Sequence, residues 1–127
     1  MPVTREVLDE RLNTFAMNGQ SVWHFAVETV PKAILSLLDE HGWRPGDVDL
    51  LILHQSNLRM IEAITLALGL PLDKTFTTIE QYGNTAAASI PITLEHAWRA
   101  GRLQPGSRVV LCGFGGGLSW GAALLEW

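Results

Sequence analysis

Three segments of the sequence hold residues whose types and spacing could do chemistry. His54 ends an apolar run, Asn84 lies in a Gly-Asn turn before a run of small residues, and Phe114 stands among the glycines of residues 113–117. Reactive groups of α/β sheets gather where strands end and loops begin. His54 is therefore a candidate catalytic residue, and the other two segments are candidate parts of the same site.

Each segment also has an ordinary structural explanation. A histidine that ends a strand can be a partly exposed polar residue, and an asparagine in a turn can adopt left-handed backbone angles or cap a helix. The glycines can form a tight connection, because glycine adopts positive φ at little steric cost. A nucleotide-binding loop is a further option, but the G-x-x-x-x-G-K-[ST] pattern is missing and the glycines precede a predicted strand.

Composition limits the class of protein. The 127 residues are 47% hydrophobic and include 12 glycines, which favours one compact globular domain. The net charge of −4 and the lack of a basic stripe argue against a nucleic-acid partner. Cys112 is the only cysteine, which excludes an internal disulfide and a multi-cysteine zinc site, and we expect no metal. The charged N-terminus and the short apolar runs predict a cytoplasmic protein without a signal peptide or a membrane span.

The elements that position these residues follow from the spacing of apolar side chains. Pro31 lies within the longest helical pattern and is expected to kink that helix or to start a second segment. The expected helices are residues 20–41, 57–68 and 85–100, and the expected strands are residues 15–17 (weak), 49–54, 75–79, 108–112 and 118–127.

Alternating strands and helices predict an α/β fold with a mainly parallel sheet and helices on both faces. The glycine loop at 114–117 is too short for a parallel crossover, so residues 118–127 should run antiparallel to the strand before them. The prediction is a five-stranded mixed sheet flanked by helices.

Taken together, the three segments resemble β-ketoacyl-acyl-carrier-protein synthase III in order and separation. They read His54-Gln-Ser-Asn-Leu-Arg59, Tyr82-Gly-Asn-Thr-Ala-Ala-Ala-Ser-Ile-Pro91 and Gly113-Phe-Gly-Gly-Gly-Leu-Ser-Trp-Gly-Ala122. The resemblance runs from about Phe15 to Trp127 and covers only the C-terminal half of such an enzyme. It implies one half of a thiolase-like fold over residues 13–127, after an N-terminal extension at residues 1–12.

The resemblance also implies a reaction. The family transfers an acyl group from coenzyme A to a cysteine and then performs a decarboxylative Claisen condensation with malonyl-acyl-carrier protein. His54 and Asn84 would be the catalytic pair that stabilises an oxyanion, and the Gly116 amide would belong to an oxyanion hole. Arg59 would help to dock an acidic carrier protein. The implied substrate-binding residues are Asn57, Phe114, Gln20 and Trp23.

The sequence departs from the family pattern in its nucleophile. The family's reactive cysteine lies in the N-terminal half, and Cys112, inside a predicted strand, is expected to be structural. Ser56 replaces the usual alanine of the histidine motif, and Leu66 and Ala67 occupy a helix region that is basic in some members. Leu66, Ala67 and the net charge of −4 weaken the expectation of carrier-protein docking and favour a coenzyme A thioester or another acceptor as substrate, with no cofactor.

Three functional hypotheses stay open at this point. The chain can be a split acyltransferase subunit that is active, as a dimer, only with a cysteine-bearing N-terminal half or homologous subunit. It can be a non-catalytic subunit that binds a thioester or scaffolds a partner, or it can be an inactive fragment. For the first hypothesis, both fatty-acid initiation and polyketide-type secondary metabolism fit the motifs.

Overall fold

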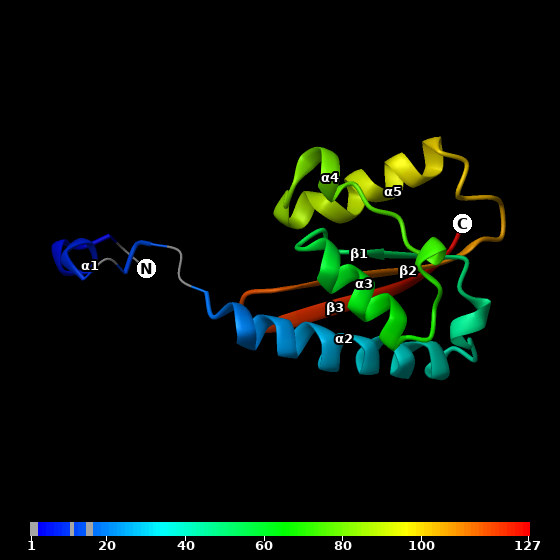
Figure 1. The fold of residues 1–127 in the computed structure, drawn as a ribbon, viewed down its shortest axis with the longest axis horizontal. Coiled ribbons are helices and arrows are strands. Elements are labelled where there is room, and N and C mark those ends of the chain that lie inside the picture. The colour runs from blue at the N-terminus through cyan, green and yellow to red at the C-terminus, as the bar shows by residue number, and fades with distance from the viewer. Residues whose placement is uncertain (1–2, 11, 15–16) are drawn as a thin grey trace.

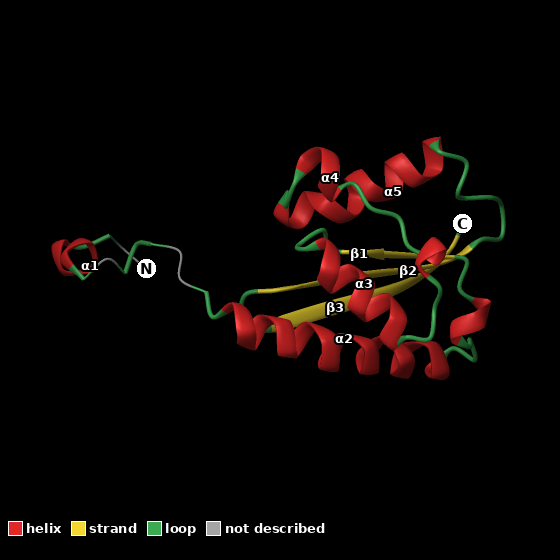
Figure 2. Cartoon of the chain, in the orientation of Figure 1, coloured by secondary structure: helices red, strands yellow, loops and turns green. Residues whose placement is uncertain are grey.

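A computed structural model describes residues 3–10, 12–14 and 17–127. Its sheet has three strands, with helices on both faces (Figure 1, Figure 2). Strand β1 (Leu50–Leu53) runs parallel to β2 (Arg108–Gly115), and β2 pairs antiparallel with β3 (Ser119–Glu126). The mixed α/β sheet and the antiparallel direction of its last strand are therefore confirmed.

The helices form a layer on each face of the sheet (Figure 1). Helices α2 and α3 pack on one face, and α5 packs on the other face, against β1 and β2. The helices are α1 (Arg5–Asp9), α2 (Gly19–Glu40), α3 (Leu58–Ala67), α4 (Ile79–Tyr82) and α5 (Ser89–Arg99), with single 3₁₀ turns at Pro45–Asp47, Leu72–Lys74 and Ala86–Ala88.

Strand β1 is buried on both faces, which explains its uninterrupted apolar sequence. Leu51 and Leu53 belong to the core under α2 and α3, whereas Leu50 and Ile52 belong to the core under α5. All four side chains are fully buried. Burial of an aliphatic side chain of this size contributes roughly 1.5–3 kcal/mol, so β1 holds the two layers together and fixes the position of the residue that follows it.

Helix α2 begins at a side-chain cap and continues through Pro31. The Asn18 Oδ1 atom accepts a hydrogen bond from the Ser21 backbone N–H at 3.0 Å, as an N-cap residue should. Pro31 is buried within the helix, which is unbroken to Glu40, so the expected second segment does not form. The apolar stripe that predicted the helix is the face that packs on α3 and on the sheet.

The prediction of five strands is wrong, because the sheet formed by the described residues has three. The weak strand expected at 15–17 lies partly outside the described residues, since the structure does not describe Phe15 and Ala16, and Met17 is not in a strand. The strand expected at 75–79 is reduced to one isolated parallel bridge between Thr75 and Leu51, and α4 begins at Ile79.

Side chains take the place of a strand ladder along residues 73–79. The Thr75 hydroxyl donates to the Leu51 carbonyl at 2.9 Å. The backbone N–H groups of Thr78 and Ile79 donate to the side-chain oxygen of Gln55 at 2.9 and 3.2 Å. The β-branched composition of this segment predicted an extended chain, but beyond the single bridge at Thr75 the N–H groups of Thr78 and Ile79 are bonded to a side chain instead of to a neighbouring strand.

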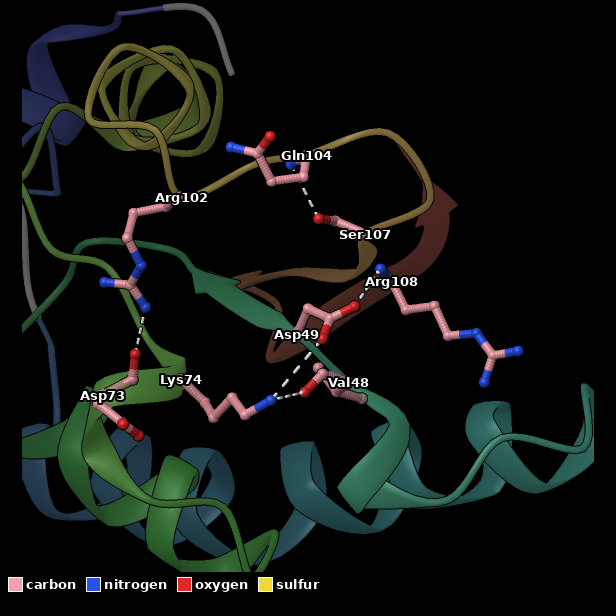
Figure 3. Close-up of polar contacts among 8 residues, drawn as sticks. All are labelled: Val48, Asp49, Asp73, Lys74, Arg102, Gln104, Ser107 and Arg108. Atoms are coloured by element: carbon pink, nitrogen blue, oxygen red, sulfur yellow. Dashed lines mark hydrogen bonds and ion pairs between the residues drawn. The ribbon is translucent and has the colours of Figure 1, made fainter.

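A polar cluster holds the amino-terminal ends of β1 and β2 (Figure 3). Asp49 accepts a hydrogen bond from the Arg108 backbone N–H at 2.9 Å and donates its own N–H to the Arg108 carbonyl at 2.8 Å. The Lys74 ammonium donates to the Val48 carbonyl at 2.9 Å, and the Arg102 guanidinium donates to the Asp73 carbonyl. These contacts anchor the Leu72–Lys74 turn to β1 without strand pairing.

Helix α1 lies well away from the sheet layers (Figure 1). The boundary between an N-terminal extension at 1–12 and a domain at 13–127 stays a prediction. Of the helices in the described part of the chain, none combines the length and the apolar character that crossing a membrane requires.

Candidate active site

A cavity of about 790 Å³ opens at the carboxyl ends of β1 and β2. Its volume falls within the range of roughly 300–1,000 Å³ that is typical of small-molecule sites. It lies where the start of α2, the loop before α5 and the β2–β3 turn come together. Its lining includes His54, Ser56, Asn84, Ala86, Phe114 and Gly116.

His54 follows β1 directly, and its backbone continues the sheet contact with a hydrogen bond from its N–H to the Cys112 carbonyl at 2.8 Å. The half-buried imidazole makes an edge-to-face contact with the Phe114 ring, with centroids 5.7 Å apart. Burial lowers the pKa of His54 below its ordinary value of 6.5, and a backbone hydrogen bond with Ala86 opposes this shift. The imidazole is therefore mainly neutral at pH 7, a form that can both donate and accept a hydrogen bond.

Asn84 lies in the loop between α4 and α5 with its side-chain orientation fixed. The Asn84 Oδ1 atom accepts a hydrogen bond from the Ala86 backbone N–H at 2.9 Å. Because a backbone N–H can only donate, the oxygen must occupy that position, and the NH₂ group is the part of the carboxamide left to donate. Ala86 has a positive φ of 51°, which is uncommon for a residue with a side chain and places strain at this turn.

The glycine segment joins β2 to β3 at the edge of the cavity. Gly113 and Gly115 are in β2, and the buried Phe114 ring between them packs into the core on the α2 side. Gly116 is in the exposed turn that follows, and its carbonyl accepts a hydrogen bond from the Ser119 hydroxyl at 3.0 Å. The strand is longer than the predicted 108–112, so the first glycines of the segment belong to the sheet and only the last ones form the turn.

Cys112 is in the middle of β2 and is 1% exposed. Burial raises the pKa of its thiol to about 12. A thiol with this pKa has almost no thiolate at neutral pH, and the thiolate is the nucleophilic form. The structure thus agrees with the expectation that Cys112 is structural.

We expect Cys112 to resist thiol reagents in the folded chain. At pH 7.5 a disulfide reagent should label it at least about 100-fold more slowly than in urea, because both burial and the raised pKa suppress the thiolate. The release of the reagent's chromophore measures this, and the urea-unfolded chain is the control. Labelling at equal rates in the two states would contradict the assignment.

The remaining residues expected at the site lie outside the cavity lining. Asn57 caps α3, where its side-chain oxygen accepts a hydrogen bond from the Met60 N–H at 3.3 Å. Arg59 is exposed on the first turn of α3. Gln20 and Trp23 are exposed on the first turns of α2, whose neighbouring residues Asn18, Ser21 and Val22 line the cavity instead.

Two buried polar residues beside the cavity carry contacts that were not expected from the sequence. Ser89, the first residue of α5, has its hydroxyl 2.7 Å from Nδ1 of His54. Gln55 is 1% exposed and binds the Leu53 carbonyl and the backbone of residues 78–79 through its side chain. Both belong to the motif segments, but nothing in their spacing indicates these partners. Their place in the motif segments is the signal in the sequence that could have singled them out.

The described residues contain no group of three or more histidine, cysteine, aspartate or glutamate side chains placed to hold a metal ion. The chemistry available at the cavity is that of neutral hydrogen-bond donors. The imidazole of His54, the NH₂ group of Asn84 and the backbone of the glycine turn line one space. Such groups suit the stabilisation of negative charge that develops on a carbonyl oxygen.

Comparison with known proteins identifies the family. The family model for the C-terminal domain of 3-oxoacyl-[acyl-carrier-protein] synthase III matches residues 38–127. A β-ketoacyl-[acyl-carrier-protein] synthase III from Porphyra umbilicalis is 48% identical over 117 residues, which are 92% of this chain and 36% of the relative. The chain thus spans about a third of the length of such relatives.

Solved structures of two β-ketoacyl-[acyl-carrier-protein] synthases III superpose on the chain. The structure from Thermus thermophilus superposes with a TM-score of 0.85 at 44% identity. The matched part is 88% of this chain and 35% of the Thermus thermophilus chain. The structure from Pseudomonas aeruginosa superposes with a TM-score of 0.89 at 38% identity. The matched part is 100% of this chain and 38% of the Pseudomonas aeruginosa chain. The fold of this chain is therefore similar to that of the matching parts of these two structures, as the resemblance implied.

Proposed function

The chain belongs to the C-terminal domain family of 3-oxoacyl-[acyl-carrier-protein] synthase III, and we propose on this basis that it forms the His- and Asn-bearing half of a condensing acyltransferase. The reaction is a decarboxylative Claisen condensation of an acyl-coenzyme A with malonyl-acyl-carrier protein. The observation that carries the proposal is the shared cavity, which brings the His54 imidazole and the Asn84 carboxamide together from separate segments of the chain.

The first role of the pair is in decarboxylation. When a malonyl thioester loses carbon dioxide, the electron pair of the broken C–C bond moves into an enolate, and negative charge develops on the thioester oxygen. A donor from the His54 ring and the Asn84 NH₂ group would both bind this oxygen. Burial keeps His54 mainly neutral, so the site binds the oxyanion through hydrogen bonds and needs no proton transfer to it.

The second step forms the new C–C bond. The enolate carbon attacks the carbonyl carbon of an acyl group held as a thioester, and the resulting tetrahedral oxyanion collapses with departure of the sulfur as thiolate. The backbone amide of Gly116, at the edge of the same cavity, would bind that second oxyanion. Phe114 lines the cavity between this turn and His54, where it would exclude water from the reacting atoms.

The acyl-bearing cysteine must come from further polypeptide, because Cys112 is buried and protonated. Strand β3 is at the edge of the three-stranded sheet, and two large apolar side chains, Leu118 (43% exposed) and Trp120 (47% exposed), are uncovered at its beginning, beside the cavity. An uncovered strand edge and exposed apolar side chains next to the cavity support a covering partner there. The proposed partner is a cysteine-bearing N-terminal half, in an enzyme that is a dimer when complete.

Substrate contacts beyond the cavity follow from the same proposal. The pantetheine arm of the thioester would be bound near the cavity mouth by Asn57, Gln20 and Trp23. Arg59 would face an acidic carrier protein. The exposed end of α3 has the uncharged residues Leu66 and Ala67, which offer no attraction to an acidic carrier protein, so a coenzyme A thioester is the alternative donor of the malonyl group.

A chimera tests the proposal. This chain would replace the matching 35% of the Thermus thermophilus synthase III, whose remaining residues would supply the cysteine-bearing half. We expect the chimera to transfer an acetyl group from acetyl-coenzyme A to its cysteine and then to condense it with malonyl-acyl-carrier protein, as measured by product mass spectrometry against the parent enzyme. Thioester binding and cysteine acylation without condensation would favour the non-catalytic alternative for this chain.

A further inference from the structure

Ser89 is a buried polar residue to which the proposed reaction assigns no role. It opens α5 next to the carboxyl end of β1, and it is 0% exposed. A fully buried hydroxyl is almost always hydrogen-bonded, because leaving it unpaired loses its interaction with water without replacement. Its partners therefore indicate what the residue does.

In the described part of the chain, the Ser89 hydroxyl has hydrogen bonds to two consecutive residues, His54 and Gln55. Its Oγ atom lies 2.7 Å from Nδ1 of His54 and 3.2 Å from the backbone nitrogen of Gln55. The Gln55 N–H can only donate, so Oγ accepts that hydrogen bond with one of its two lone pairs. The bond to His54 can then run in either direction, and the count of protons decides which.

The hydroxyl has one proton, and Nδ1 of His54 is the only acceptor that bonds to it among the described residues. If Nδ1 carried the imidazole proton, it would donate to Oγ, and the hydroxyl proton would have no acceptor in a fully buried position. If the hydroxyl donates to Nδ1, every proton in the cluster is paired. The second arrangement satisfies the buried groups, and the first does not.

We propose that Ser89 is a positioning residue that donates its hydroxyl proton to Nδ1 of His54 and thereby holds the neutral imidazole in the tautomer with its proton on Nε2. With Nδ1 occupied by the hydroxyl, the ring proton is on Nε2, which is the nitrogen able to donate to the Ala86 backbone or to a ligand in the cavity that His54 lines. A donor at this place is what an enolate oxygen requires. The relevance to condensation rests on the proposed function, whereas the choice of tautomer does not.

Nuclear magnetic resonance of the ¹⁵N-labelled 127-residue chain tests the tautomer directly. Long-range ¹H–¹⁵N correlations at pH 8 distinguish the two neutral forms, and a His54→Gln variant identifies the His54 signals among the 4 histidines. We expect the wild-type ring to be protonated on Nε2. In Ser89→Ala the ratio of the two tautomers should move about tenfold toward Nδ1–H, the effect of one ordinary hydrogen bond.

Thr93→Val is the matched control, one helical turn after Ser89. Thr93 is also 0% exposed and its hydroxyl donates to the Ser89 carbonyl at 2.8 Å and contacts the Thr78 hydroxyl at 2.7 Å, but it does not contact His54. Its loss should leave the tautomer of His54 unchanged. If Ser89→Ala does not fold, Ser89→Cys keeps a small side chain with a weaker donor, and a smaller shift in the same direction is expected.

The proposal is overturned by a wild-type His54 protonated on Nδ1, or by a folded Ser89→Ala chain with the wild-type ratio of tautomers. A rate measurement in the chimera separates this proposal from the proposed function. We expect Ser89→Ala to slow decarboxylation of a malonyl thioester about tenfold with little change in KM. An altered tautomer with an unchanged rate would instead overturn the role given to His54.

Discussion

In the chimera, Asn84→Asp is expected to slow decarboxylation of a malonyl thioester by about 10²–10³-fold, the usual effect of removing one oxyanion donor. The substitution is chosen because it preserves the local fold. A carboxylate oxygen can still accept the hydrogen bond that the Ala86 N–H now donates to Oδ1 at 2.9 Å. What disappears is the NH₂ donor, and a negative charge takes its place beside the developing oxyanion.

His54→Ala should lower the rate of decarboxylation by a similar factor. The rate of the double variant should fall by less than the product of the two single-variant factors. The donors act on one oxygen, so removing the second costs less once the first is gone. Transfer of the acetyl group to the cysteine should continue in both variants, because it does not use this oxyanion site.

The control for these variants is His41→Gln. His41 is exposed at the end of α2, where Nδ1 lies 2.9 Å from the Leu37 carbonyl, and it does not line the cavity. Its substitution should leave both half-reactions unchanged. Retention of full decarboxylation activity by His54→Ala and by Asn84→Asp would refute the proposed roles of both residues.

The positions of His54, Asn84, Phe114 and Gly116 around one cavity could be predicted from sequence. The strand-end rule places His54 and the glycine segment at the same edge, because β1 and β2 are parallel. The resemblance to the family motifs predicted Asn84, whose loop lies at the same edge of the sheet, just before α5. The chemical roles stay proposals, but the meeting of these segments follows from hydrophobic patterning that the core confirms.

The contacts of Ser89 and Gln55 could not be predicted, because each polar side chain bonds a partner far away in the sequence. Ser89 meets His54 across 35 positions, and Gln55 meets the Thr78 N–H across 23. No local pattern specifies such pairs. The strand predicted at 75–79 is wrong for the same reason. The composition of this segment favours an extended chain, but the N–H groups of Thr78 and Ile79 donate to the side chain of Gln55.

Gln55 accordingly has the largest expected effect on stability. Its Nε2 group donates to the Leu53 carbonyl at 2.8 Å, and its Oε1 atom accepts from the N–H groups of Thr78 and Ile79 at 2.9 and 3.2 Å. One buried carboxamide thus joins the end of β1 to the start of α4, the segment that leads to the Asn84 turn. The described part of the chain leaves no buried side-chain polar atom without a partner, and both polar atoms of this amide are bonded to backbone groups.

Gln55→Met is expected to lower the free energy of unfolding by about 3 kcal/mol or more. Methionine has a similar length, but it leaves buried backbone donors and an acceptor unpaired, at about 1–3 kcal/mol for each lost group. Urea unfolding followed by the fluorescence of the 5 tryptophans measures the change. Hydrogen exchange should also become faster at residues 78–84 than in the rest of the folded chain, because their attachment to β1 is lost.

Thr65→Val is the matched control, since Thr65 is also 0% exposed and polar. Its hydroxyl donates to the Ile61 carbonyl at 2.8 Å, one turn back in α3, where the helix itself satisfies that carbonyl. Valine keeps the shape of the side chain, so the loss should stay below about 1 kcal/mol. Equal losses for the two variants would mean that burial of any polar group in this core matters equally. We expect the larger loss for Gln55→Met, because its hydrogen bonds join β1 to the start of α4 whereas that of Thr65 stays within one helix.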